Sequence, residues 1–232
     1  MDPILTIEQA IPTPPFSAPD PPPLTLTLAP GQSKALLGPE GCGKSHLLMM
    51  LAGLHPPATG SITLDGVQLE AYSDRGRAQL IGLLFQNPEH PFLTLTVQEE
   101  ITLTPAGLGL SGQPLKQRVQ CAMTECNIPQ SWAERELSSL SWSEKCRVAM
   151  AAVWAAEPKV ILADEPGAFR STDGELQMAE QLQHYLNNHN AAALIVTSRA
   201  RRARRFAQET ILWPGFQATP TTPTPPTPKG HA

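Results

Sequence analysis

The sequence lacks any long hydrophobic run of the kind that a membrane-spanning helix requires. Crossing a bilayer takes about 20 consecutive apolar residues, and no stretch of this 232-residue chain approaches that length. The first five residues also lack the basic and apolar regions of a secretory signal, so we expect no signal peptide. A chain that crosses the membrane itself is therefore not predicted.

An excess of positive charge and a metal-binding cysteine pattern are also missing. The formal net charge is −4, so no overall basic field would attract nucleic acid, and we expect no nucleic-acid partner. The cysteines show no metal-ligand spacing and are expected to be reduced thiols, mostly in the core, of a cytoplasmic protein. They are Cys42, Cys121, Cys126 and Cys146.

Proline, by contrast, is abundant. The chain has 25 prolines, and many of them fall in two clusters. Residues 11–23 are expected to form an extended connection between two strands. Residues 218–232, rich in proline and threonine, bury too little apolar surface to offset the entropy of ordering, so a disordered tail is predicted there. The preceding residues 1–217 are enough for one α/β domain with a full core and a small inserted subdomain.

The most informative segment is residues 38–45, which read G-x-x-x-x-G-K-S. Its glycines let backbone N–H groups curl around a triphosphate, while Lys44 is placed for the β- and γ-phosphates and Ser45 offers a hydroxyl to Mg²⁺. An apolar strand before the loop and a helix expected at about 43–53 make a glycine turn without a ligand the weaker interpretation. The predicted nucleotide-binding residues of this segment are Gly38, Pro39, Glu40, Gly41, Cys42, Gly43, Lys44, Ser45 and His46.

The pattern of apolar residues predicts two kinds of strand. Residues 5–7 and 24–28 alternate apolar and polar, and residues 60–67 carry a hairpin signal, so a small antiparallel sheet is expected. Near-continuous apolar runs predict strands buried in a parallel sheet. Those runs lie at 80–85, 159–163 and 191–196, and the chain between about 96 and 157 is expected to be mostly helical.

Polar residues follow each of the predicted parallel strands, where ligands of such sheets bind. Gln86 follows the first, Asp164 and Glu165 the second, and Ser198 the third. Asp164 can hold Mg²⁺, and Glu165 is placed to polarise an attacking water. A helix start with Asp164 as its N-cap is the alternative, and the phosphate loop upstream makes it the minor one.

The long separation between Lys44 and Asp164, filled by a helical insertion, resembles the ATP-binding cassette (ABC) ATPases over residues 4 to about 215. Residues 59–66 are similar to the family's early strand and turn, and residues 82–90 to its glutamine loop. Two further segments resemble the cobalt and energy-coupling-factor branch of the family. That branch energises uptake of vitamins and transition-metal ions. Those segments are residues 92–101 and 105–110.

The resemblance implies an α/β P-loop NTPase fold with a mostly parallel core sheet, a small antiparallel subdomain and an inserted helical subdomain at about 87–157. It implies an ATPase in which Glu165, Gln86 and Lys44 are catalytic and Phe16 stacks on the base. Mg²⁺ would be held by Ser45, Gln86 and Asp164. The implied partners are a second ATPase, identical or different, and an integral membrane transporter subunit, with this chain peripheral on the inner face of the cell membrane.

The sequence departs from the family's pattern at three important places, one of which is Ser171, where the family's loop after Glu-Pro ends in aspartate. The signature Leu-Ser-Gly-Gly-Gln is replaced by residues 140–144, in which both glycines are lost. Trp142 adds bulk where a backbone should approach a phosphate, whereas Ser141 and Glu144 are spaced as a capping box that starts a helix. The family's switch histidine is replaced by Ser198. The altered signature positions are Ser141, Trp142, Ser143 and Glu144.

Two hypotheses follow. The first is a catalytic subunit that hydrolyses ATP to drive a transporter, which the retained Glu165 favours. The second is a regulatory or scaffold subunit that binds ATP but hydrolyses it slowly beside a catalytic partner, which Ser198 and the altered signature favour. A nucleic-acid-associated cassette is disfavoured because coiled-coil insertions are absent. The arginines between 199 and 205 are interpreted as a solvated helix face, with a nucleic-acid or lipid-headgroup patch as the alternative.

Overall fold

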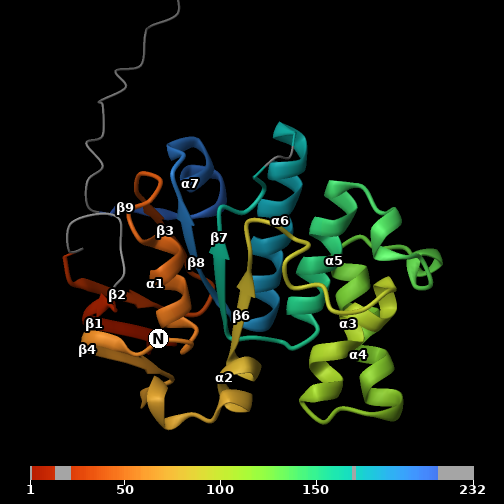
Figure 1. Cartoon of the computed structure of the whole chain (residues 1–232), viewed down its shortest axis with the longest axis horizontal. Helices are drawn as coiled ribbons and strands as arrows, with labels where there is room; N and C mark the ends of the chain where they lie inside the picture. Colours follow the sequence, from red (N-terminus) through yellow and green to blue (C-terminus); the bar gives the residue numbers. More distant parts are fainter. Residues whose placement is uncertain (1, 14–21, 169–170, 214–232) are drawn as a thin grey trace, which may run out of the picture.

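Two sheets organise the chain in the computed structural model, which describes residues 2–13, 22–168 and 171–213. The strands are β1 (Leu5–Pro12), β2 (Leu24–Leu28), β3 (Ser33–Leu37), β4 (Pro57–Leu64), β5 (Val67–Gln68), β6 (Ile81–Leu84), β7 (Val160–Asp164), β8 (Ala192–Thr197) and β9 (Glu209–Leu212). One sheet has the order β6-β7-β8-β3-β9 with every pairing parallel, and the other has the order β2-β1-β4-β5 with every pairing antiparallel. The predicted combination of a parallel core sheet and a small antiparallel sheet is confirmed (Figure 1).

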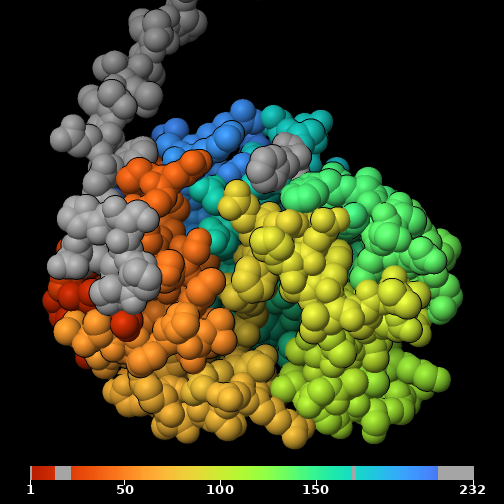
Figure 2. All heavy atoms as spheres, viewed as in Figure 1, coloured from red at the N-terminus to blue at the C-terminus, as the bar shows by residue number. Residues whose placement is uncertain are grey.

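The helices divide between the two sides of the molecule. They are α1 (Lys44–Leu51), α2 (Asp74–Leu80), α3 (Val97–Gly107), α4 (Gly112–Glu125), α5 (Trp142–Trp154), α6 (Thr172–His189) and α7 (Ala200–Phe206). Helices α3, α4 and α5 gather at the β6 side, away from the antiparallel sheet (Figure 1). Figure 2 shows the same division, with the green segment opposite the orange one. Within the described residues, no helix is both long enough and apolar enough to cross a membrane.

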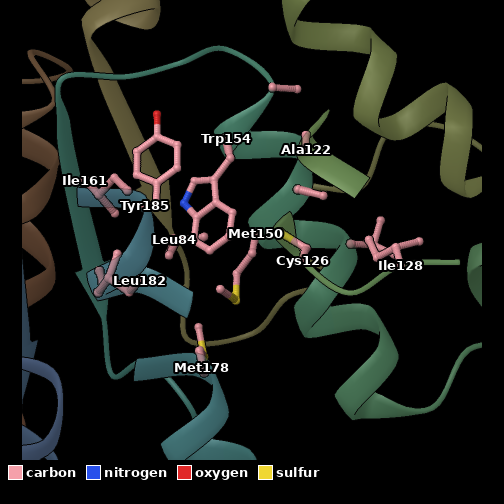
Figure 3. Packing of buried hydrophobic residues seen from close by; sticks show 14 of the residues in the cluster. Leu84, Ala122, Cys126, Ile128, Met150, Trp154, Ile161, Met178, Leu182 and Tyr185 are labelled. Carbon is pink, nitrogen blue, oxygen red and sulfur yellow. The ribbon is translucent and has the colours of Figure 1, made fainter. Parts of the chain in front are cut away.

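The parallel sheet separates two hydrophobic cores. Alternate residues of a strand point to opposite faces, so Ile161 and Ala163 join the core beneath α5 and α6, whereas Val160 and Leu162 join the core shared with α1 and the antiparallel sheet. Strands covered on both faces need continuous apolar runs, which is what the sequence has at β7 and β8. Figure 3 shows the first core.

Aromatic side chains fill the centre of the first core. The rings of Trp154 and Tyr185 stack with centroids 5.0 Å apart and an interplanar angle of 11°. Burial raises the pKa of the Tyr185 hydroxyl well above its usual value, and this hydroxyl donates to the carbonyl of Pro158 at 3.2 Å. The stack joins α5 to α6 (Figure 3). It packs in the same core as Ile161 and Ala163 of β7.

Local signals in the sequence account for some of the element boundaries. The Asp65-Gly66 turn joins β4 to β5 as the hairpin signal predicts. Helix α3 continues through Pro105 and ends at Gly107. A proline in a helix removes one backbone hydrogen bond, and here the helix continues for only two residues beyond it. Helix α2 and strand β9 were not predicted.

Two glycines of the antiparallel sheet provide a matched test of its packing. Gly60 has a φ of +81°, and a Cβ at this position would lie 2.3 Å from the carbonyl oxygen of Gln9, in the irregular part of β1. Gly66 has a φ of +75°, but a Cβ there would meet nothing within 4 Å.

We predict that Gly66→Ala costs about 1 to 2 kcal/mol of unfolding free energy, because only the left-handed backbone is penalised. Gly60→Ala should cost at least about 2 kcal/mol more, since its Cβ would collide with backbone that has to move. Denaturant unfolding of both variants measures the difference. Equal losses would contradict the close approach at Gly60.

Candidate nucleotide-binding site

A polar cavity of about 480 Å³ lies where the carboxyl ends of β6, β7 and β8 meet the start of α1. It collects residues that are far apart in the sequence, which is the arrangement predicted for a ligand site of a parallel sheet. The lining residues are Glu40, Gly41, Gly43, Lys44, Ser45, His46, Gln86, Asp164, Glu165, Ala168, Ser198, Arg199 and Arg202.

The loop between β3 and α1 has the backbone that its glycines predict. Gly41 and Gly43 adopt φ values of +76° and +90°, which favour glycine. The Lys44 side chain is buried and folds back on the loop, where its Nζ donates to the carbonyl oxygens of Gly38 at 2.9 Å and Pro39 at 2.6 Å. Its Nζ also contacts the Cys42 sulfur at 3.9 Å. Because no carboxylate is among these partners in the described residues, the ammonium can turn to an entering anion without leaving a carboxylate unpaired.

The loop is supported from behind by Trp213, the residue that follows β9. Trp213 is buried, and its Nε1 donates to the carbonyl oxygen of Cys42 at 3.2 Å. A Cβ at Gly38 would lie 2.9 Å from the Cys42 sulfur and 3.1 Å from the Trp213 Cβ. Gly38, Pro39 and Cys42 therefore form the base of the loop and are not among the lining residues, whereas the other predicted residues of the loop face the cavity.

Ser45 and Asp164 meet across the cavity. The Ser45 hydroxyl donates to Oδ2 of Asp164 at 2.7 Å, although the two residues are 119 positions apart. Burial, with a smaller contribution from the neighbouring Glu165 charge, raises the pKa of Asp164, because the hydrogen bond from Ser45 only partly offsets these effects. A nearby cation would stabilise the charged form of this partly buried carboxylate.

The donor set fits Mg²⁺. Hydroxyl, carboxylate and amide oxygens from Ser45, Asp164 and Gln86 line the same cavity, and Mg²⁺ is commonly held by one or two carboxylates together with substrate phosphates and water. No cluster of three or more His, Cys, Asp or Glu side chains that could hold a metal ion occurs in the part of the chain that the structure describes.

Glu165 follows β7 with a strained backbone and a fully engaged carboxylate. Its φ is +44°, in the left-handed region that non-glycine residues rarely adopt. Oε2 accepts from the Thr197 hydroxyl at 2.7 Å and from the Arg202 guanidinium at 2.6 Å. Oε1 accepts from the backbone N–H of Ser198 at 2.5 Å. Burial, the largest single effect, would raise the pKa of Glu165, but these hydrogen bonds together outweigh it and lower the pKa.

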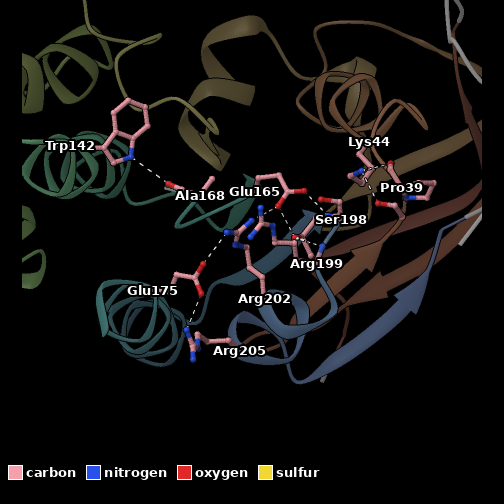
Figure 4. A network of polar contacts seen from close by, with 12 residues as sticks. Pro39, Lys44, Trp142, Glu165, Ala168, Glu175, Ser198, Arg199, Arg202 and Arg205 are labelled. Atoms are coloured by element: carbon pink, nitrogen blue, oxygen red, sulfur yellow. Dashed lines mark hydrogen bonds and ion pairs between the residues drawn. The ribbon is translucent and has the colours of Figure 1, made fainter. Parts of the chain in front are cut away.

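Arg202 was missed as a site residue by the sequence analysis. Its side chain is 5% exposed and bridges two carboxylates, because Nη1 contacts Glu165 and Nη2 contacts Oε1 of Glu175 at 2.9 Å. Arg205 pairs with the other oxygen of Glu175 at 2.8 Å. Figure 4 shows the four side chains in one network. The expectation of a solvated arginine face is therefore wrong for Arg202, which lies on the buried face of α7.

A signal for this was present in the sequence. Arg202 is adjacent to Ala203 and four residues before Phe206, and both of these are buried. Residues four apart lie on one face of a helix, so the apolar spacing of α7 places Arg202 on the inner side. Arg199, which also lines the cavity, is exposed. The run of arginines thus divides between the two sides of the helix.

The altered signature lies apart from this cavity, at the start of α5. Ser141 and Glu144 form the predicted capping box, with Glu144 Oε2 accepting from the Ser141 N–H at 2.7 Å. That bond, with help from the Ser141 hydroxyl and from Arg135, lowers the pKa of Glu144 to about 2. The Trp142 indole donates to the carbonyl oxygen of Ala168 at 3.4 Å, which reaches the cavity wall.

The remaining predicted positions are Ser143, Ser198 and Phe16, and they differ in whether they line the cavity. Ser143 follows Trp142 in the first turn of α5 and does not line the cavity. Ser198 lines the cavity and donates its backbone N–H to Glu165, and a hydrogen bond from its side chain also helps to lower the pKa of Glu165. Phe16, the expected base-stacking residue, and the predicted tail at 218–232 lie outside the described residues.

Known proteins resemble this chain over most of its length. The family model described as ABC transporter matches residues 22–168. An ABC transporter ATP-binding protein of Gloeobacter violaceus is 42% identical over 146 residues, which are 62% of this chain and 60% of the relative. The energy-coupling factor transporter ATP-binding protein EcfA1 of Lactiplantibacillus plantarum is 32% identical over 174 residues, 75% of this chain and 62% of the relative. The chain thus spans about three fifths of these two curated relatives.

A solved structure has the same fold. It is that of cbiO1 from Clostridium perfringens, described as part of the ABC transporter complex cbiONQ. The TM-score is 0.81 at 24% sequence identity, and the match covers 92% of this chain and 85% of the other. The predicted fold class is confirmed by this likeness.

We predict that Lys44→Ala weakens the affinity for Mg·ATP by about ten- to a hundredfold, because hydrogen bonds to charged groups are worth about 1.5 to 3 kcal/mol. Lys159→Ala is a control, since Lys159 pairs with Asp65 away from the cavity. Calorimetric titration of both variants measures the affinities. Unchanged affinity in the Lys44 variant would contradict a phosphate site at this loop.

Proposed function

The chain belongs to the ABC transporter family, and from this premise we propose that it binds Mg·ATP and hydrolyses it to energise a membrane transporter. The observation that carries the proposal is the 2.7 Å contact between the Ser45 hydroxyl and Asp164. It joins the phosphate loop to the end of β7 at the point where a phosphate-bound Mg²⁺ is expected. A glycine turn without a ligand would have no reason to face a partly buried carboxylate.

In the proposed reaction the residues of this chain bind the nucleotide and its metal ion and orient the attacking water. Lys44 would leave the carbonyl oxygens of its loop for the β- and γ-phosphates, and the N–H groups around Gly41 and Gly43 would surround them. Ser45, Gln86 and Asp164 would hold Mg²⁺, which neutralises charge on the phosphate oxygens when it is bound. Glu165 would orient the attacking water and accept its proton, as a base positioned at the γ-phosphate does in phosphoryl transfer.

The base in this proposal starts from a restrained position. Both oxygens of Glu165 are engaged by Thr197, Ser198 and Arg202 in the structure. A carboxylate oxygen can accept two hydrogen bonds. Oε2 already accepts from Thr197 and Arg202, so the attacking water would bind at Oε1, beside the Ser198 N–H. Its lowered pKa keeps it ionised at neutral pH but makes it a weaker base.

A membrane subunit is the proposed partner at the segment that follows Gln86. Leu93 and Leu95 are 79% and 78% exposed, next to a groove of about 240 Å³ that Phe85 and Leu103 help to line. Exposed apolar side chains around a groove are typical of a protein interface.

The segment is held in shape from beneath. Glu100 is buried, and its Oε2 accepts hydrogen bonds from the backbone N–H groups of Leu93 and Thr94, each at 3.0 Å. The apolar side chains are therefore presented on an ordered loop. Contact with an apolar segment of a partner would remove these side chains from water, which is favourable.

The kind of transporter is part of the same proposal. We propose uptake of the energy-coupling-factor type, of a metal ion or a vitamin, supported by segments 92–101 and 105–110 and by the name of the EcfA1 relative. The chain would lie in the cytoplasm against the inner face of the membrane. A second ATPase chain, identical or different, would complete the site with its signature segment.

A subunit that binds ATP and hydrolyses it slowly is the second candidate, and specific contacts favour it. The amide at the start of α5 is already occupied by the Glu144 carboxylate, whose charge would oppose a phosphate of a facing chain. Trp142 occupies the position of a lost glycine and contacts Ala168. Ser198 supplies no imidazole beside Glu165. On this account the chain would support a catalytic partner.

We predict that Glu165→Gln lowers steady-state ATP turnover by about 10²- to 10⁴-fold, because a positioned general base is lost. Glu180→Gln on the exposed face of α6 is the matched control and should keep wild-type turnover. Phosphate release, measured with and without a membrane partner, gives both rates. If wild type and Glu165→Gln share one background rate while both bind ATP, the slowly hydrolysing candidate is correct.

A further inference from the structure

A chain of alternating charges runs from the cavity into the protein through α6 and α7. It starts at Glu165, continues through Arg202 and Glu175, and ends at Arg205 (Figure 4). Glu165 and Arg202 are both buried and line the cavity, whereas Glu175 and Arg205 are not among the residues that line it. One end of this charge network, at Glu165, therefore faces the ligand cavity, and the other end, at Arg205, joins α6 to α7.

The two arginines of this network make different contacts. Arg205 already ties α7 to α6 through Glu175 and through the carbonyl oxygen of Thr172 at 3.1 Å. Arg202 contacts Glu175 as well, but it is the residue that extends the network to Glu165. Within the described residues, Nε of Arg202 has no hydrogen-bond partner although it is buried. The guanidinium thus retains a donor that neither β7 nor α6 uses.

The charges around the cavity explain why Arg202 is needed there. Asp164 and Glu165 are adjacent carboxylates at a site that is proposed to receive a polyphosphate. Mg²⁺ would balance Asp164, and the ammonium of Lys44 would balance phosphate. Among the other lining cations, Arg199 is exposed, so the buried positive charge in contact with Glu165 is that of Arg202.

We propose that Arg202 is a positioning residue that acts as the counter-ion of Glu165 and so lets this carboxylate lie beside a bound nucleoside triphosphate. The proposal rests on the proposed function, because it needs Mg·ATP in the cavity. Without Arg202, the negative charge of Glu165 would be uncompensated in a buried place and would repel the γ-phosphate. The arginine therefore acts on nucleotide affinity through Glu165 and on the orientation of Glu165 through its contact with Oε2.

A double-mutant cycle tests this inference. The proteins are wild type, Arg202→Met, Glu165→Gln and the Arg202→Met/Glu165→Gln double variant, and the probe is Mg²⁺ with a non-hydrolysable ATP analogue at pH 8. We expect Arg202→Met to weaken the affinity by about tenfold or more, from the Coulomb energy of one unbalanced charge. The double variant should return to within about threefold of wild type, because both charges are then gone.

Arg205→Met is the matched control. It removes a guanidinium from the same helix and the same partner, Glu175, but leaves the contact to Glu165 in place. Its affinity for the analogue should stay within about threefold of wild type. A loss as large as that of Arg202→Met would show that the helix contact matters rather than the charge on Glu165, and would overturn the proposal.

The other outcomes are equally decisive. If the double variant stays as weak as Arg202→Met, or if Arg202→Met binds like wild type, Arg202 is not the counter-ion of Glu165. If Arg202→Met does not fold, a double variant that folds and binds like wild type supports the proposal, and one that does not overturns it. If wild type itself binds no Mg-nucleotide, the proposed function fails and this inference fails with it.

Discussion

The register of the parallel sheet is the constraint on which the site depends. Leu37, the last residue of β3, pairs with Thr197 at the end of β8, and Asp164 at the end of β7 pairs with Val196. The phosphate loop, the two carboxylates and the Thr197–Ser198 segment therefore leave the sheet side by side. A slip of one residue would turn each side chain to the opposite face of its strand and would separate Ser45 from Asp164.

The apolar runs enforce this register. Because β7 and β8 are buried on both faces, each strand has to present the right side chains to two different cores. The polar residues begin only where the strands end, so the first side chains that cannot be buried in either core are those that meet in the cavity. Hydrogen bonds and ion pairs then stabilise the site. Glu165 is held by Thr197, Ser198 and Arg202, and Lys44 is held by two backbone carbonyl oxygens and the Cys42 sulfur.

Much of this could be predicted from the sequence, because the signals are local. The glycines of the phosphate loop, the apolar strands and the Ser141–Glu144 capping box each act within a few residues. Arg202 could not be assigned in this way, because its partners Glu165 and Glu175 are 37 and 27 residues away. The charge run around it also hid the apolar spacing of Ala203 and Phe206. Strand β9 was missed because Glu209–Leu212 is short and pairs at the edge of the sheet with β3.

The most direct test of the account is a crystal structure of the chain with Mg²⁺ and a non-hydrolysable ATP analogue. We expect the phosphates to lie over the N–H groups of residues 41–45, with Lys44 turned from its carbonyl oxygens to the phosphates. The Ser45 and Asp164 oxygens should face the metal ion, and Arg202 should still contact Glu165. A nucleotide bound elsewhere, or a metal ion that neither Ser45 nor Asp164 approaches, would contradict the account.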